Sequence, residues 1–250
     1  MRNHTERAIF YFFTGILRSS KKHKLHLTFV MALPTGYIVT QLVYHYIKKG
    51  GFYFYNIEPV LLSLPFILFF SAIAGLRTVV DIPVMPEANW IFKLSEGQNL
   101  KHYRKGVKKA IFFSSILPMF VIMGIFYFYS WDFRPAAIHS LFSFSMVLLL
   151  LEVFFLDYRK IPFTCVYNPQ ASNPKTTWPL FFVIFIVYVY TFTMLDLYLL
   201  TRPQSNGYYY FFLFLVFFRL KRQEYKSRQS GLLFAEYPSP VFLSLDINKD

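Results

Sequence analysis

Seven polar or charged side chains interrupt otherwise apolar stretches and are the candidate chemical groups of this chain: Asp196, Glu152, Arg77, Tyr37, Gln41, Tyr44 and His45. Asp196 follows Phe192 and Thr193 by about one helical turn. An ionisable group inside a membrane helix is costly unless it faces protein or water, so Asp196 is a functional candidate by default. The alternative is structural, with Asp196 reaching interfacial water or pairing with Arg202 or Arg134 on the same side of the membrane.

Glu152 and Arg77 are expected to form an ion pair between neighbouring helices. Each lies near the end of its apolar segment that we assign to the inner side of the membrane. A carboxylate and a guanidinium at the same depth neutralise each other, and this reduces the cost of burying both. We therefore interpret this pair as structural.

Four polar residues share one face of the first apolar segment. Gln41, Tyr44 and His45 follow Tyr37 at offsets of four, seven and eight, which places them together on a helix. Pro34 interrupts the same segment. A polar stripe beside a kink can line a pathway or a pocket, but such residues more often bond to neighbouring helices, and we favour the second interpretation.

The inventory for catalysis and for cofactors is thin. The sequence contains no HExxH or GxSxG motif, and no span carries two acids within one turn of each other. Four histidines invite a haem interpretation, but each lies at the margin of a span or outside it, whereas such a site needs ligands deep between helices: His26, His45, His102 and His139. The single cysteine, Cys165, excludes an internal disulfide. We therefore predict no catalytic residue, no metal site and no cofactor, and an enzyme is the minority hypothesis.

The elements that position these residues are six apolar segments: Leu27–Ile47, Pro59–Val80, Ile111–Ser130, Ala136–Leu156, Pro179–Leu200 and Pro203–Leu220. About 20 apolar residues in a helix cross the roughly 30 Å hydrocarbon core of a bilayer. The sixth segment is the weakest, because its purely apolar run, Tyr208–Phe218, is short. Ser71 and Gly75, four residues apart, form a small-residue face suited to close helix packing.

The basic residues predict the orientation. Of 26 lysines and arginines, 21 fall on one side of the six segments, four on the other, and Arg77 lies inside a segment. By the positive-inside rule both termini are cytoplasmic. The net charge of +13 then reflects topology and contact with anionic head groups rather than nucleic-acid binding. We divide the chain into a cytoplasmic segment 1–26 with an interfacial helix over Ala8–Leu17, a six-span domain 27–220 and a basic cytoplasmic tail 221–250.

Three runs carry a family resemblance: Asp81-Ile82-Pro83 through Glu87 to Phe92, Arg159 to Cys165, and Leu233 to Glu236. They resemble segments of uncharacterised multi-spanning bacterial integral membrane proteins. Those proteins are longer, so the chain is similar to their C-terminal portion. The resemblance implies a home in the bacterial cytoplasmic (inner) membrane and a link to export systems of the ABC type.

Two loops on the predicted cytoplasmic side contain prolines that restrict their turns and aromatic residues that suit contact with a partner: Trp90, Phe92, Phe163 and Tyr167. We therefore predict an all-α polytopic membrane bundle that serves as the membrane subunit of a transport or export assembly, with a protein partner on its cytoplasmic face and the lipid bilayer around it. The alternatives are a membrane scaffold without transport activity and a membrane enzyme acting on a lipid or lipid-linked substrate.

Overall fold

The structure, a computed structural model, describes residues 4–50, 58–84, 100–156, 163, 174–202 and 206–226. Every regular element in these ranges is helical. Five helical segments are long and apolar enough to cross a membrane: Lys21–Lys48, Pro59–Val80, His102–Ser130, Phe133–Phe154 and Phe181–Thr201. The described part of the chain is therefore an all-helical protein of the multi-pass membrane class.

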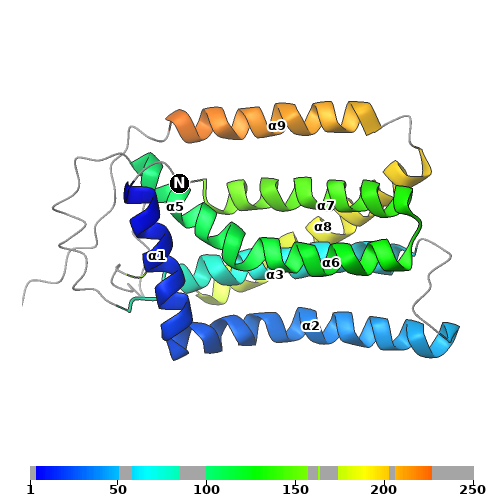
Figure 1. Ribbon diagram of the computed structural model, residues 1–250, viewed down its shortest axis with the longest axis horizontal. Coiled ribbons are helices and arrows are strands. Elements are labelled where there is room, and N and C mark those ends of the chain that lie inside the picture. The colour runs from blue at the N-terminus through cyan, green and yellow to red at the C-terminus, as the bar shows by residue number, and fades with distance from the viewer. Residues whose placement is uncertain are drawn as a thin grey trace, which may run out of the picture.

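The elements follow one another as α1 (His4–Ser19), α2 (Lys21–Lys49), α3 (Pro59–Val80), α5 (Leu100–Ile111), the π-helical turn η2 (Phe112–Ile116), α6 (Leu117–Ser130), α7 (Phe133–Phe154), α8 (Pro174–Thr201) and α9 (Asn206–Lys226). The long helices α2, α3, α6, α7, α8 and α9 run along the length of the molecule, and α1 lies across one end of them (Figure 1). We refer to this as the α1 end of the bundle.

Helix α3 is the central helix. Most of its side chains are buried, and it packs against α2, α7 and α8. Gly75 permits the close approach of α2, since a Cβ atom there would lie 3.1 Å from Val30 Cγ1 and 3.3 Å from Leu27 Cδ1. The small-residue face around Gly75 therefore packs against a neighbouring helix, as the sequence predicts.

The helix that leads from α5 into α6 changes geometry at η2. Pro118 has no backbone N–H, and its ring would clash with the carbonyl four residues earlier in a regular α-helix. The chain accommodates it through a π-turn, in which the backbone N–H of Leu117 donates to the Phe112 carbonyl. Figure 1 shows α5 inclined to α6 at this junction, so the amphipathic α5 lies at the α1 end while α6 joins the bundle.

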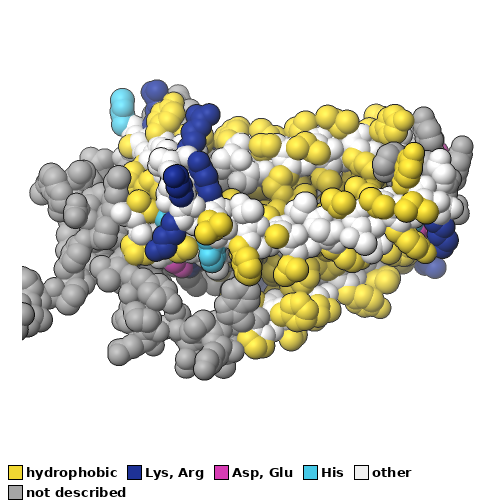
Figure 2. Space-filling view, turned by 90° about the horizontal axis from the view of Figure 1, so that it is seen from below, with side chains coloured by type: hydrophobic (Ala, Val, Ile, Leu, Met, Phe, Trp, Pro, Cys, Tyr) yellow, Lys and Arg dark blue, Asp and Glu magenta, His cyan; other side chains and the backbone are white. Residues whose placement is uncertain are grey.

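Helix α1 packs on α5 with its apolar face. Ile9, Phe13 and Ile16 are buried, and Ile9 lies over Gly106, where a Cβ atom would come within 2.9 Å of its side chain. Lys and Arg side chains gather at this end, whereas apolar side chains cover the long sides of the bundle (Figure 2). This distribution is typical of a protein with lipid around its sides and water at its ends.

The predicted apolar segments correspond to helices, with differences at their ends. Pro59–Val80 is confirmed as α3, and the helix predicted over Ala8–Leu17 is present as α1. Helix α2 begins at Lys21, before the predicted Leu27, because a helix continues through charged residues once its backbone ladder is formed. For the same reason α9 continues to Lys226 instead of ending at Leu220. Helix α9 is not among the five helices that qualify as spans by length and composition.

Candidate functional site

A completely buried ionisable pair joins α7 to α8. His139 Nδ1 lies 2.5 Å from Asp196 Oδ2, and both side chains have 0% exposure. In an antiparallel pair of helices, a residue near the start of the first lies at the level of a residue near the end of the second, and the two meet only when they also face each other. Here the contact follows from the packing of α7 against α8.

The imidazole of His139 is enclosed by aromatic rings from other helices. Its ring centroid lies 4.3 Å from that of Tyr127 and 5.4 Å from that of Trp131, both at the end of α6, and 6.4 Å from that of Phe66 on α3. Tyr127 is itself held in place, since its hydroxyl donates to the Leu61 carbonyl at 2.7 Å. Aromatic rings therefore surround the imidazole, and neither side chain of the pair is exposed to bulk solvent.

The second polar atom of each partner has no hydrogen bond within the described residues. These atoms are Asp196 Oδ1 and His139 Nε2. Other buried polar atoms in the described part that share this property include Thr193 Oγ1, the hydroxyls of Ser143 and Tyr209, and Trp131 Nε1. Since most buried polar groups in folded proteins are hydrogen-bonded, a concentration of unpartnered atoms calls for a functional explanation.

The pair lies inside the helices rather than at their ends. His139 is six residues after the start of α7, and Asp196 is five residues before the end of α8, so each lies about 8 to 9 Å from the helix end at a rise of 1.5 Å per residue. Both distances are measured from the helix end that lies opposite α1. An ion pair at this depth is desolvated, and replacing such a pair by apolar residues is often neutral or stabilising.

Comparison with family models, with curated proteins and with solved structures gives no match for this chain. The role of the pair is therefore argued from its geometry and chemistry.

The structure corrects the expected partners of Asp196. The carboxylate does not pair with Arg202 or Arg134 and is not exposed to interfacial water; it contacts His139. His139, which the sequence placed at a span margin, is fully buried. Depth is the signal that would have found the pair, because the two residues lie at similar distances from those ends of consecutive antiparallel helices that are opposite α1.

Glu152 also has different partners from those expected. Its carboxylate accepts hydrogen bonds from Lys108 Nζ on α5 at 2.6 Å and from Lys221 Nζ on α9 at 2.7 Å, and it does not contact Arg77. The prediction failed because the rotation of α7 about its axis, which sequence spacing does not give, turns Glu152 toward α5 and α9. This cluster ties three helices together near the α1 end and is structural in character.

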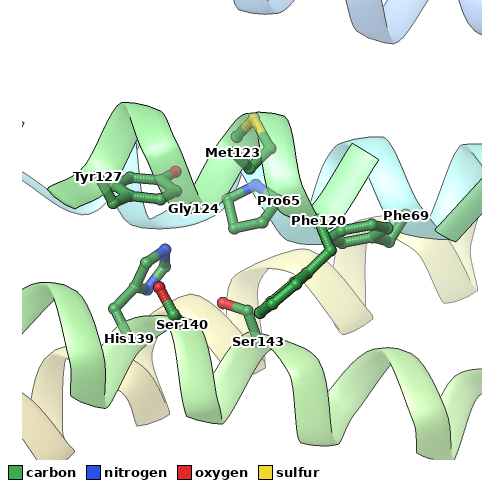
Figure 3. A pocket seen from close by; sticks show the side chains of 9 residues that line it. All are labelled: Pro65, Phe69, Phe120, Met123, Gly124, Tyr127, His139, Ser140 and Ser143. Atoms are coloured by element: carbon green, nitrogen blue, oxygen red, sulfur yellow. The ribbon is translucent and has the colours of Figure 1, made fainter. Parts of the chain in front are cut away.

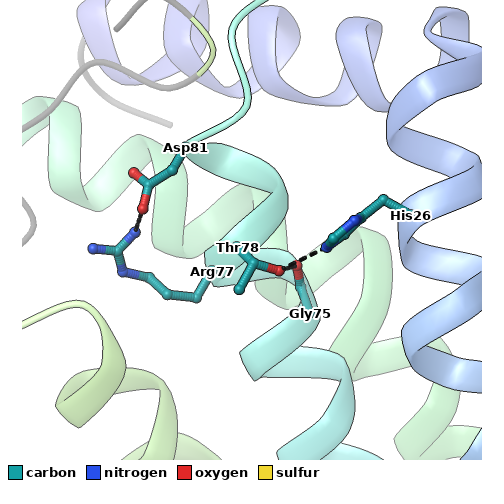
Figure 4. Close-up of polar contacts among 5 residues, drawn as sticks. All are labelled: His26, Gly75, Arg77, Thr78 and Asp81. Atoms are coloured by element: carbon teal, nitrogen blue, oxygen red, sulfur yellow. Dashed lines mark hydrogen bonds and ion pairs between the residues drawn. The ribbon is translucent and has the colours of Figure 1, made fainter. Parts of the chain in front are cut away.

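Arg77 forms an ion pair with Asp81 at the end of its own helix, α3. Its Nη1 donates to Asp81 Oδ2 at 2.6 Å, one turn later (Figure 4). Its guanidinium lies 5.9 Å from the centroid of the Phe155 ring. Beside it His26 Nε2 lies 3.1 Å from Thr78 Oγ1, which donates to the Gly75 carbonyl. The His26–Thr78 contact joins the end of α3 to α2.

The polar stripe of α2 does not converge on a pocket. Tyr37 and Tyr44 are exposed on the outer face, Gln41 is half-buried, and only His45 is buried. His45 Nε2 lies 3.0 Å from Glu58 Oε2, just before α3. Through His45 the stripe therefore joins the end of α2 to the residue that precedes α3.

The prediction that Phe163 is an exposed partner contact is wrong. Its side chain has 0% exposure, and its ring lies 5.3 Å from that of Phe13 on α1 and 5.1 Å from that of His23 on α2. Its backbone bonds to Val80 and Val84. The Phe163 ring therefore packs inside the α1 end of the bundle. The other three predicted contacts, Trp90, Phe92 and Tyr167, lie outside the described residues.

The remaining histidines occupy separate contacts. His102 Nδ1 lies 3.2 Å from Glu6 Oε1, and Lys109 Nζ donates to Glu6 Oε2, so this group joins α5 to α1. In the described ranges no three histidine, cysteine or acidic side chains come together as a metal site requires. A carboxyl and an imidazole in contact, as in the His139–Asp196 pair, are groups that can exchange a proton.

Proposed function

We propose that this protein is a membrane subunit of a transport or export assembly in which the His139–Asp196 pair binds and releases a proton. The observation that supports the proposal is the completely buried contact between these side chains inside the apolar bundle. Ionisable residues in membrane spans mark proton relays and coupling sites in pumps and transporters.

A purely structural role explains this site less well. A helix contact in the membrane needs only close packing, which α3 already provides for α2 through Gly75. The His139–Asp196 contact additionally buries two ionisable groups, and each of them keeps one polar atom without a hydrogen bond in the described residues. A site that gains or loses a proton needs a polar atom that is available to a second partner. In a purely structural contact, a buried polar atom without a hydrogen bond lowers stability.

We further propose six crossings with both termini in the cytoplasm of a bacterial cell, the protein residing in the inner membrane. The distribution of basic residues supports this orientation, as does their accumulation at the α1 end (Figure 2). Helix α9 runs beside α7 along the bundle (Figure 1), and Lys221 reaches Glu152 at the same end as Lys108. A helix in this position completes the sixth crossing.

Cysteine labelling tests the topology. In a Cys165→Ser background, single cysteines replacing Lys105 and Arg222 are expected to resist an impermeant reagent added outside intact cells, and one replacing Arg134 is expected to react. Reaction of the position-222 cysteine from outside would show that α9 does not cross.

Purification from native membranes in mild detergent tests membership of an assembly. We expect a co-purifying subunit with a phosphate-binding GxxxxGK[ST] loop, the signature of an ATPase, at constant stoichiometry. Isolation of this chain alone, or only with copies of itself, would contradict the assembly. The Asp196→Asn variant should retain the partner, because the pair lies within the bundle and away from its ends.

A second candidate function is supported by a groove of about 470 Å³ between α7, α8 and α9. Apolar side chains line it, among them Met146, Leu195 and Phe212, together with Tyr209. A groove of this size and character suits a hydrocarbon chain, and the buried acid and imidazole lie on the same helices. A membrane enzyme acting on a lipid would modify lipid substrates without a partner, and loss of that turnover in Asp196→Asn would favour it over transport.

A further inference from the structure

A small cavity lies between α3, α6 and α7 beside the buried pair. Its volume, about 10 Å³, is close to that of a single water site. Pro65, Phe120 and Met123 form its apolar side, and His139, Ser140 and Ser143 of α7 form its polar side (Figure 3). The cavity therefore adjoins the imidazole of His139 on the side of α6.

Three polar atoms of these lining residues are buried and have no hydrogen bond in the described part of the chain: His139 Nε2, Ser140 Oγ and Ser143 Oγ. Serine hydroxyls in helices ordinarily donate to the carbonyl four residues earlier. Ser145 on the same helix does so, with Leu141 as acceptor at 2.7 Å, and Ser71 on α3 does so with Ile67. The hydroxyls of Ser140 and Ser143 make no such bond and remain available to the cavity.

We propose that this cavity binds one water molecule, held by His139 Nε2 and by the hydroxyls of Ser140 and Ser143. Buried waters typically make about three hydrogen bonds to polar groups that otherwise lack partners. The number of available atoms, their burial and the volume of the cavity all meet this requirement. An apolar occupant would leave three buried polar atoms without a hydrogen bond, which is unfavourable.

The water gives His139 a partner in either protonation state. Nδ1 is committed to Asp196, so the change in protonation of the ring is expressed at Nε2, which accepts a hydrogen bond when neutral and donates one when protonated. Water serves both roles by turning. This role in proton binding rests on the proposed function, whereas the water site itself does not.

Solid-state NMR of protein with ¹⁵N-labelled histidine in lipid bilayers tests the site. The Nε2 signal of His139, assigned by its loss in His139→Asn, should receive magnetisation from water protons. In Ser143→Val, which fills the cavity and removes one hydroxyl, this transfer should be lost, while the matched variant Ser145→Ala should keep it.

Two results would overturn the proposal. One is the absence of transfer in the wild-type protein, a measurement that does not depend on the folding of any variant. The other is undiminished transfer in a folded Ser143→Val. If transfer is present but Asp196 does not titrate, the water site stands and the proton-binding function falls, so the two failures are distinguishable.

Discussion

Lys108 on α5 donates to the carboxylate of Glu152 on α7 across 2.6 Å, and both side chains are about nine-tenths buried. This contact holds the inclined helix α5 against the bundle. Lys221 on α9 approaches the other oxygen of the same carboxylate. The packing of three helices, α5, α7 and α9, therefore depends on the carboxylate of Glu152.

Glu152→Leu is expected to destabilise the bundle by about 3 kcal/mol, because it removes the carboxylate that the buried Lys108 ammonium faces. The free energy of unfolding, measured in mixed micelles, reports this change. The matched control, Lys221→Gln, removes a partner that is 41% exposed and should cost less than about 1 kcal/mol. Adding Lys108→Met to Glu152→Leu should recover part of the loss; equal effects of Glu152→Leu and Lys221→Gln would contradict the assignment.

Gly106→Ala is expected to loosen α1. The new Cβ would lie 2.9 Å from Ile9 Cβ and 3.1 Å from the Glu6 carbonyl, so α1 must shift even though alanine favours the helical state of α5. Faster amide exchange over residues 4–19 would report the shift. Gly15→Ala, at a position with no atom within 4 Å, is the control and should leave exchange unchanged or slower. Unchanged exchange in Gly106→Ala would mean that α1 does not rest on α5.

The packing of α1 should depend on pH through Glu6. Burial alone would raise the pKa of this carboxyl, but the hydrogen bonds from Lys109 and His102 and the charges of Lys109 and Lys105 outweigh it, so the pKa falls below its ordinary value of 4.5. A lowered pKa in the folded state means that the contribution of Glu6 is complete above about pH 4.5 and fades as the pH falls through the folded-state pKa.

Amide exchange of α1 followed between pH 7 and pH 3 measures this dependence. In Glu6→Gln the acid-dependent component should disappear, and α1 should exchange faster already at pH 7. An identical pH profile in the wild-type protein and in Glu6→Gln would show that another group controls the contact.

Phe163→Ala is expected to destabilise the α1 end by about 3 to 5 kcal/mol, the usual cost of removing a buried phenylalanine ring. Phe163 has a φ of 64°, in the left-handed region that favours glycine. Phe163→Gly loses the same ring but relieves this backbone strain, so it should be milder than Phe163→Ala by about 1 kcal/mol. Wild-type stability of both variants would show that the Phe163 ring does not stabilise the α1 end.

Apolar length predicted the helices well because the bilayer leaves few alternatives to a helix of about 20 residues. The bounds of α3 follow directly from its apolar run, and Gly75 packs as its small-residue neighbours indicate. The apolar run Ala8–Leu17 likewise predicts the helix that the structure contains as α1. These features depend on local sequence, which a single chain displays.

The polar contacts were less predictable because each joins residues far apart in the chain. Asp196 was recognised as a candidate, but its partner His139 lies 57 residues away, and Glu152 lies 44 residues from Lys108. Which acid meets which base depends on the order of helices in space and on the rotation of each helix. A search for ionisable residues at the same depth as Asp196 would have reduced the number of possible partners for it. Nothing in the sequence spacing distinguishes Lys108 from Arg77 as the partner of Glu152.

Infrared difference spectroscopy of the protein in lipid bilayers, recorded as the pH is varied, tests proton binding by the pair most directly. We predict a protonated-carboxyl band from a buried acid that appears and disappears reversibly with pH. The band should be absent in Asp196→Asn, titrate differently in His139→Gln and persist in the control Glu152→Gln. If no band is lost in Asp196→Asn at any pH at which the protein remains folded, Asp196 does not exchange a proton, and the proposed role of the pair is wrong.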